Sequence, residues 1–132
     1  MSHLPVFAVD GATLRLANLA LDAYAQRHRV ISENIANIHA DDFQPLSLNF
    51  EQQLGALRRA VKDGVPDTVI DRLVGQVHPY AVETQSAAQP SRPSERLDDQ
   101  MTALVFNTLN YESMLTAVGR MESIYRLAIT GS

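Results

Sequence analysis

Apolar residues in the first part of the chain recur at alternating steps of four and three between Gly11 and Ile38. This spacing predicts one face of an α-helix of about 27 residues, roughly 40 Å long. Asp10 stands directly before the helix and is expected to cap its first turn. The small residues Ala20 and Ala36 beside this face allow a partner helix to approach closely. The face consists of Ala17, Leu21, Tyr24, His28, Ile31, Ile35 and Ile38.

A second helix is predicted between Leu97 and Ile129, where the same alternation continues with two polar interruptions, Thr108 and Glu122. Further apolar residues widen this face beyond a narrow two-stranded seam, so we expect it to contact more than one partner. Gly131 is well placed to end the helix. The repeat is Leu97, Met101, Leu104, Thr108, Tyr111, Leu115, Val118, Glu122, Tyr125 and Ile129, widened by Val105, Leu109, Met114, Met121 and Ile124.

The stretch between the two helices follows a different pattern. Residues 43–49 are predicted to be extended, because Pro45 disfavours helix at the residue before it. Residues 50–61 predict a short amphipathic helix, which the run 64–66 of Gly, Val and Pro would end. Residues 67–74 predict one or two further helical turns.

The last part of this middle stretch carries more helix-breaking residues. Residues 76–84 predict a short edge strand interrupted by Pro79. Residues 85–96 contain two further prolines and several Ser, Ala and Gln residues, and we interpret them as a mobile linker.

The chain therefore divides into an N-terminal axial helix at residues 1–40, a variable middle at residues 41–96 and a C-terminal axial helix at residues 97–132. We predict a mainly α fold, in which the long terminal helices pair as a coiled-coil-like hairpin or bundle beside a middle of short helices and irregular segments. Each terminal helix has an apolar face that must be buried. Its partner is either the other helix of the same chain or the same face of a neighbouring subunit.

The composition narrows the range of functions. The net charge is −4 and no basic face is clustered, so we expect no nucleic-acid binding. The chain has no cysteine, which excludes disulfides, thiolate nucleophiles and cysteine-based zinc sites. Its start lacks the basic residues of a signal peptide. The longest uncharged run, residues 100–111, is much shorter than the roughly 20 residues of a membrane span. We therefore expect a soluble protein without a classical export signal.

Few side chains are candidates for metal binding or pH sensing. His39, Asp41 and Asp42 form a compact group that can bind a divalent cation weakly. Three such ligands in one loop do not define a closed site, so a solvated acidic loop is the favoured interpretation. His28 is either a pH-sensitive element or, as we favour, a packed or edge histidine.

Catalytic candidates are equally sparse. Glu95, Asp98 and Asp99 are of the residue types used in acid–base chemistry, but they cluster where a helix begins and complement its positive end. A small enzyme with a site in the middle region would use His78 and Tyr80, and neither has an evident catalytic neighbour in the sequence. We predict no enzyme activity, cofactor, metal or small-molecule substrate.

Residues 25–37, with the sequence AQRHRVISENIAN, resemble the N-terminal signature of flagellar rod and hook proteins. In that family an apolar helix ends in Asn-(Ile/Leu)-Ala-Asn before a turn, and here the motif runs from Asn34 to Asn37. Asn suits such an exit because it tolerates left-handed backbone geometry and bonds local backbone groups. The family usually continues with Thr-Pro-Gly-Tyr. This chain instead has residues 40–43, in which the aromatic Phe43 is kept in kind.

The other end of the chain agrees with this resemblance. The run from Asn107 to Gly131 is similar to the closing helix of the proximal-rod subfamily, and residues 97–101 loosely resemble that subfamily's acidic entry into the helix. Residues 48–54 resemble its extended segment and short helix. The rest of the middle matches no pattern that we recognise.

The resemblance implies a structural subunit of the bacterial flagellar basal-body rod. Such a subunit passes through the flagellar type III export apparatus without a cleaved signal peptide and assembles in the periplasm by helix–helix packing. The implied partners are other rod subunits, the adaptor at the rod base and the export gate, in homo- and hetero-oligomers. The alternative is a soluble cytoplasmic helical binding module or an export-system adaptor.

The residues expected to build the assembly interface lie on the two terminal helices and at the exit of the first. They are Leu21, Tyr24, Ile31, Asn34, Ile35, Asn37, Leu104, Tyr111, Leu115, Val118 and Tyr125.

Overall fold

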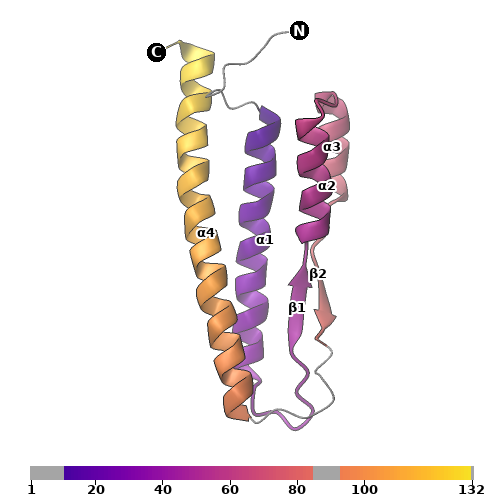
Figure 1. Ribbon diagram of the computed structural model, residues 1–132, viewed down its shortest axis with the longest axis vertical. Helices are drawn as coiled ribbons and strands as arrows, with labels where there is room; N and C mark the ends of the chain where they lie inside the picture. Colours follow the sequence, from indigo (N-terminus) through magenta and orange to yellow (C-terminus); the bar gives the residue numbers. More distant parts are fainter. Residues whose placement is uncertain (1–10, 85–92, 132) are drawn as a thin grey trace.

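The computed structural model describes residues 11–84 and 93–131, which form four helices and two short strands (Figure 1). In chain order these are α1 (Gly11–Ala36), β1 (Leu46–Asn49), α2 (Glu51–Lys62), α3 (Asp67–Gln76), β2 (Tyr80–Glu83) and α4 (Pro93–Thr130). The fold is mainly α, as the sequence predicts.

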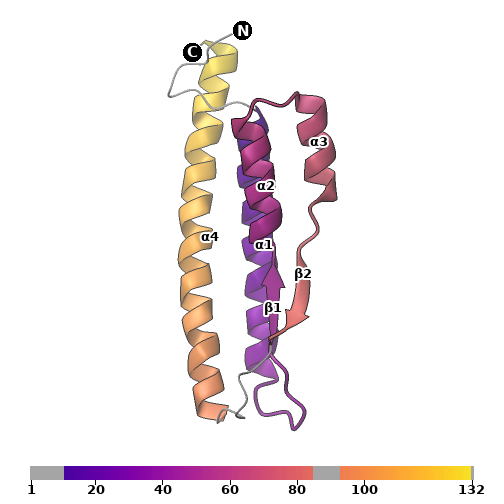
Figure 2. The same cartoon turned by 45° about the vertical axis from the view of Figure 1, so that its right-hand side comes forward.

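The two terminal helices lie side by side and run in opposite directions (Figures 1 and 2). At 1.5 Å per residue, the 26 residues of α1 span about 39 Å and the 38 residues of α4 about 57 Å. Gly11 at the start of α1 lies beside the ring of Tyr125 near the end of α4. At the other end, Asn34 of α1 hydrogen-bonds to Gln100 of α4. The predicted pairing of the terminal helices is therefore confirmed, in antiparallel form.

The middle of the chain packs on α1 away from α4, so α1 is the central element (Figure 1). Alanines on this side of α1 let the short elements approach closely, and larger side chains fill the space between them. One buried cluster joins α1, α2 and α3, and a second joins α1, β1 and α2. The first contains Ala12, Leu57 and Ile70, and the second contains Ala23, Leu48 and Phe50.

The two strands form an antiparallel pair in which Leu46 lies opposite Glu83 and Asn49 opposite Tyr80. A two-stranded sheet is marginally stable by itself. Here the buried side chain of Leu48 anchors it to α1. The extended prediction for residues 43–49 and the strand prediction for residues 76–84 are confirmed in part, because each strand is four residues long.

The linker predicted over residues 85–96 is wrong at its end, because α4 already begins at Pro93. Proline suits the first helical position, where its missing N–H is not needed and its φ angle matches the helix. Residues 85–92 of that linker, and the proposed cap Asp10, lie outside the described residues. Gly131 ends α4 as predicted, with a φ of 69° and a hydrogen bond from its N–H to the carbonyl of Leu127.

The face of α4 that packs on α1 differs from the predicted one by one of its two rows. The row of Leu104, Tyr111, Val118 and Tyr125 is buried or half-buried, as predicted. Its companion row is Gln100, Asn107, Met114 and Met121, of which the two methionines belong to the predicted widening of the face. In the predicted companion row, Met101, Leu115 and Ile129 are instead exposed.

The predicted face of the first helix is buried or half-buried at every position except His28. His28 is exposed at the edge of the helix pair, which agrees with the favoured interpretation of an edge histidine. Ala20 is buried as predicted, whereas Ala36 is exposed and allows no close approach. Because α1 packs on two sides, its buried positions extend beyond a single face.

Candidate assembly surfaces

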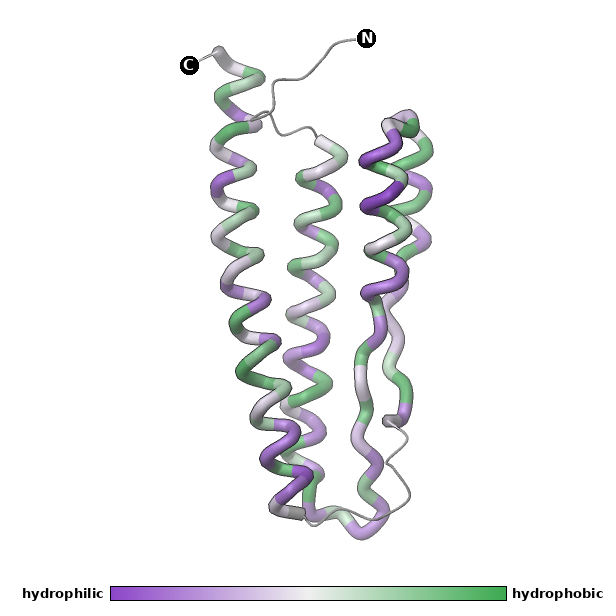
Figure 3. Tube along the Cα trace, in the orientation of Figure 1, coloured by the Kyte–Doolittle hydropathy of each residue, from purple (hydrophilic) through white to green (hydrophobic). Residues whose placement is uncertain are grey.

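Helix α4 exposes large apolar side chains, of which Phe106 and Leu115 flank the contact with α1 and line hollows beside residues of that helix. The exposed fraction is 55% at Val105, 64% at Phe106 and 53% at Leu109. Figure 3 shows hydrophobic segments along the length of α4, interleaved with polar ones. Large exposed apolar patches typically mark protein–protein contacts. We call these residues the outer face of α4: Met101, Val105, Phe106, Leu109, Leu115, Leu127 and Ile129.

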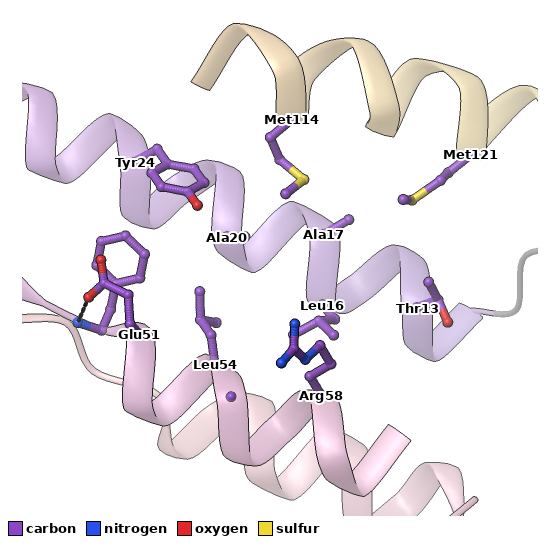
Figure 4. A pocket seen from close by; sticks show the side chains of 12 residues that line it. Thr13, Leu16, Ala17, Ala20, Tyr24, Glu51, Leu54, Arg58, Met114 and Met121 are labelled. Atoms are coloured by element: carbon purple, nitrogen blue, oxygen red, sulfur yellow. Dashed lines mark hydrogen bonds between the residues drawn. The ribbon is translucent and has the colours of Figure 1, made fainter. Parts of the chain in front are cut away.

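A groove of about 450 Å³ lies between α2 and α4, with α1 as its floor (Figure 4). Ala17 and Ala20 keep this floor low, because their side chains end at the β-carbon. Leu54 and Arg58 of α2 line one side, and Met114 and Met121 of α4 line the other. We call this feature the alanine groove. Its size and apolar lining suit the side chains of a further helix.

The buried amide of Asn34 connects three elements. Its Nδ2 donates to the carbonyl of Leu46 at 2.7 Å and to Oε1 of Gln100 at 2.9 Å, and its Oδ1 accepts from the N–H of Leu46 at 3.0 Å. It therefore satisfies both backbone groups of one β1 residue as a neighbouring strand would. Asn107 makes a second polar bridge, donating from Nδ2 to the carbonyl of Tyr24 at 2.9 Å.

The hydrogen bonds of Asn34 and Asn107 set the register of α1 against α4, and those of Asn34 also set its register against β1. A polar residue on a packed helical face specifies register, because a shift leaves its hydrogen-bonding groups unpaired. This effect is strongest for Asn34, whose Oδ1 and Nδ2 are both bonded, because the Oδ1 of Asn107 is buried without a hydrogen-bond partner among the described residues. Sequence analysis missed Gln100 and Asn107 since both are polar. The sequence signal for this polar bridge was Asn107, which lies on the same helical face as Leu104 and Tyr111.

A second polar connection joins α1 to the start of α2. Nη2 of Arg27 donates to the carbonyl of Leu48 at 2.7 Å and to Oε1 of Glu51, and its guanidinium lies 4.2 Å from the centre of the Phe50 ring. Burial acts to raise the pKa of Glu51. The hydrogen bond from Arg27, those from the backbone N–H groups of Glu51 and Phe50, and the positive charge of Arg27 outweigh it, so the pKa lies below its ordinary value.

Most predicted assembly residues lie on the seam between α1 and α4. Ile31, Asn34 and Val118 are buried there, whereas Asn37 and Leu115 are exposed. That these side chains contact other subunits stays a prediction. The half-buried members are Leu21, Tyr24, Ile35, Leu104, Tyr111 and Tyr125.

The Asn34–Asn37 exit does not use left-handed geometry. Among the described residues, positive φ angles occur at glycines alone. Asn37 instead donates from its backbone N–H and from Nδ2 to the carbonyl of Glu33, at 3.1 and 2.9 Å. The following turn closes with a hydrogen bond from the N–H of Phe43 to the carbonyl of Ala40, and the guanidinium of Arg96 lies over the Phe43 ring.

The residues considered for metal binding or catalysis do not converge. In the ranges 11–84 and 93–131, no three His, Cys, Asp or Glu side chains form a group able to hold a metal ion, so His39, Asp41 and Asp42 build no site. His78 bonds through its backbone to the side-chain amide of Gln53, and Tyr80 is half exposed on a strand. Among the described residues, no helix is long and apolar enough to cross a membrane.

Long paired helices with an exposed apolar face are typical of a subunit that packs against other helices. Among characterised proteins, the chain is similar to flagellar basal body rod proteins. The FlgB proteins of Escherichia coli (strain K12) and Shigella flexneri are each 25% identical to it, in an alignment that covers 92% of this chain and 96% of theirs. No protein-family model matches the chain. The resemblance to rod proteins is thus confirmed, and at this coverage it includes most of the middle.

Proposed function

We propose that this chain is a structural subunit of a flagellar basal body rod that assembles by packing its helices against neighbouring subunits. The outer face of α4 carries the proposal. Exposing this many large apolar side chains to water is unfavourable, and the fold of the single chain leaves them uncovered. The similarity to rod proteins over 92% of the chain supports the same function.

The finer features of the proposal follow from the resemblance at the two ends. The subunit would leave the cell through the type III apparatus without a cleaved signal peptide and join the periplasmic part of the rod. Its partners would be other rod subunits, the adaptor at the rod base and the export gate. The Asn34–Asn37 exit would set the point at which α1 ends and the chain turns back towards β1.

Fractionation of the bacterium that carries this gene tests the proposal. Deleting the gene should abolish motility and rod assembly, and the tagged protein should copurify with isolated basal bodies. A matched membrane protein outside the flagellum serves as the control for contamination. Recovery in the cytosol alone, with normal swimming after deletion, would overturn the rod function and favour the cytoplasmic binding module.

A further inference from the structure

We propose that α4 of one copy docks into the alanine groove of a second copy. The docking element is the ridge formed by Met101, Val105 and Leu109, which lies on the outer face of α4. This inference rests on the proposed function, because it names the partner and the geometry of one subunit contact. It has its own test, which does not depend on recovery from basal bodies.

The ridge belongs to a single helical stripe of suitable length. Met101, Val105 and Leu109 follow one another at steps of four, so their side chains project on the same side of α4. Their exposed fractions are 46, 55 and 53%. The stripe from Met101 to Glu112 covers eleven steps, about 17 Å.

The alanine groove offers a matching site. Its lining on α1 runs from Thr13 to Tyr24, which is also eleven steps or about 17 Å. The helices α1, α2 and α4 occupy three positions around it, and a helix laid against Ala17 and Ala20 would complete a four-helix bundle. Small floor residues let that helix approach to the short end of the usual 8–10 Å interaxial distance.

The chemistry of the two surfaces is complementary. The ridge is apolar, and no charged residue occurs between Gln100 and Tyr111. Met114 and Met121 line the groove, and their flexible side chains can adapt to the side chains of the ridge. Arg58 at the rim of the groove and Glu112 one turn beyond the ridge are both exposed, and neither forms an ion pair within the described residues. Seating the ridge so that Glu112 meets Arg58 pairs both charges.

The positions of the two surfaces make the contact open-ended. Nine residues, or about two and a half helical turns, separate Val105 on the ridge from Met114 at the groove, so the two side chains project from opposite sides of α4. A contact between different surfaces on opposite sides leaves one ridge and one groove free after every addition. Such heterologous contacts generate open arrays rather than closed pairs.

Disulfide trapping tests the docking, because the chain has no cysteine of its own. One full-length variant carries Val105→Cys on the ridge, and another carries Leu54→Cys in the groove. Mixed and oxidised, they should form a disulfide heterodimer, since that bond requires α-carbons within about 7 Å. The matched control replaces either partner with Arg72→Cys on the exposed surface of α3, and it should not cross-link.

Two results would overturn the docking. One is a mixture that cross-links no more than the control, with circular dichroism showing both variants folded. The other is efficient dimerisation of the Val105→Cys chain by itself, which would mean that ridge packs on ridge. If the chain copurifies with basal bodies and the heterodimer does not form, the rod function stands and the docking mode is wrong. If the heterodimer forms but the chain is absent from basal bodies, the docking mode stands and the rod function is wrong.

A charge exchange supplies the second measurement. Glu112→Arg on the ridge chain, or Arg58→Glu on the groove chain, should each reduce heterodimer formation by placing like charges together. Using both changes in the same mixture should restore it. Reduction without restoration would show that the two residues do not face each other, and would overturn the proposed seating.

Discussion

Nδ2 of Asn34 lies 2.9 Å from Oε1 of Gln100 and thereby joins the last turns of α1 to the first turns of α4 across 66 residues of sequence. The same amide also holds both backbone groups of Leu46 on β1. One buried side chain thus determines how three elements sit against one another. The first Asn of the family-like motif is therefore a structural tie inside the subunit.

Replacing Asn34 with Ala should destabilise the chain by about 1–3 kcal/mol, because the backbone N–H and C=O of Leu46 lose their partner in a partly buried site. Urea unfolding followed by circular dichroism measures this. Asn37→Ala is the matched control from the same motif. Its exposed side chain bonds within its own helix end, so a change within about 0.5 kcal/mol is expected. Equal losses in both variants would contradict the role assigned to Asn34.

Aspartate substitutions separate folding from assembly on α4. Val118 is 5% exposed on the seam, so Val118→Asp should cost more than about 3 kcal/mol by burying a charge. Leu115 is 49% exposed, so Leu115→Asp should leave the purified chain folded, with its free energy of unfolding within about 1 kcal/mol of wild type. Motility and rod assembly should nevertheless be lost in both. Normal swimming with Leu115→Asp would count against the outer face as an assembly surface.

The ion pair between Arg27 and Glu51 should make stability depend on pH. Because folding lowers the pKa of Glu51 below 4.5, its contribution is present above that value and is lost as the pH falls through the folded-state pKa. The free energy of unfolding of wild type should exceed that of Glu51→Gln at neutral pH, and the difference should shrink in acid. High salt should reduce this difference in the free energy of unfolding at neutral pH, since the pair is partly exposed. A difference that is independent of pH would contradict this assignment.

Enlarging an alanine of α1 should lower the free energy of unfolding where β1 and α2 pack on it, and should have little effect where they do not. Ala23 is 1% exposed beside Leu48 and Phe50, so Ala23→Leu should destabilise by about 1–3 kcal/mol through overpacking. Ala25 is exposed on the same helix, and Ala25→Leu should change the free energy of unfolding by no more than about 0.5 kcal/mol. Thermal or urea unfolding compares the two. Similar values would mean that the middle does not pack tightly on α1.

The outline of the fold follows from local patterns. The four-and-three spacing predicted both long helices, because helical periodicity is a property of nearby residues. Pro and Gly in the middle predicted where the short elements end, and Gly131 predicted the end of α4. The early start of α4 was missed, because Pro93 was interpreted as a linker residue when proline also suits a first helical turn.

The candidate surfaces were harder to predict. Apolar residues occur all around α4 between Gln100 and Tyr111, so periodicity cannot choose which row faces α1. The alanine groove is built from three helices far apart in sequence, so the pattern of no single segment predicts it.

The sequence by itself determined that a long helix with a large apolar face lies towards each end of the chain, since residue spacing and helix-breaking residues have their effect within a few turns. The tertiary structure decided which face of α4 is buried and which is left outward. The physical reason is that Gln100 and Asn107 are acceptable on the packed side only where α1 offers them partners, in the side chain of Asn34 and the carbonyl of Tyr24. Those partners exist once the helices are packed, and their position leaves Val105 and Leu109 on the outer face.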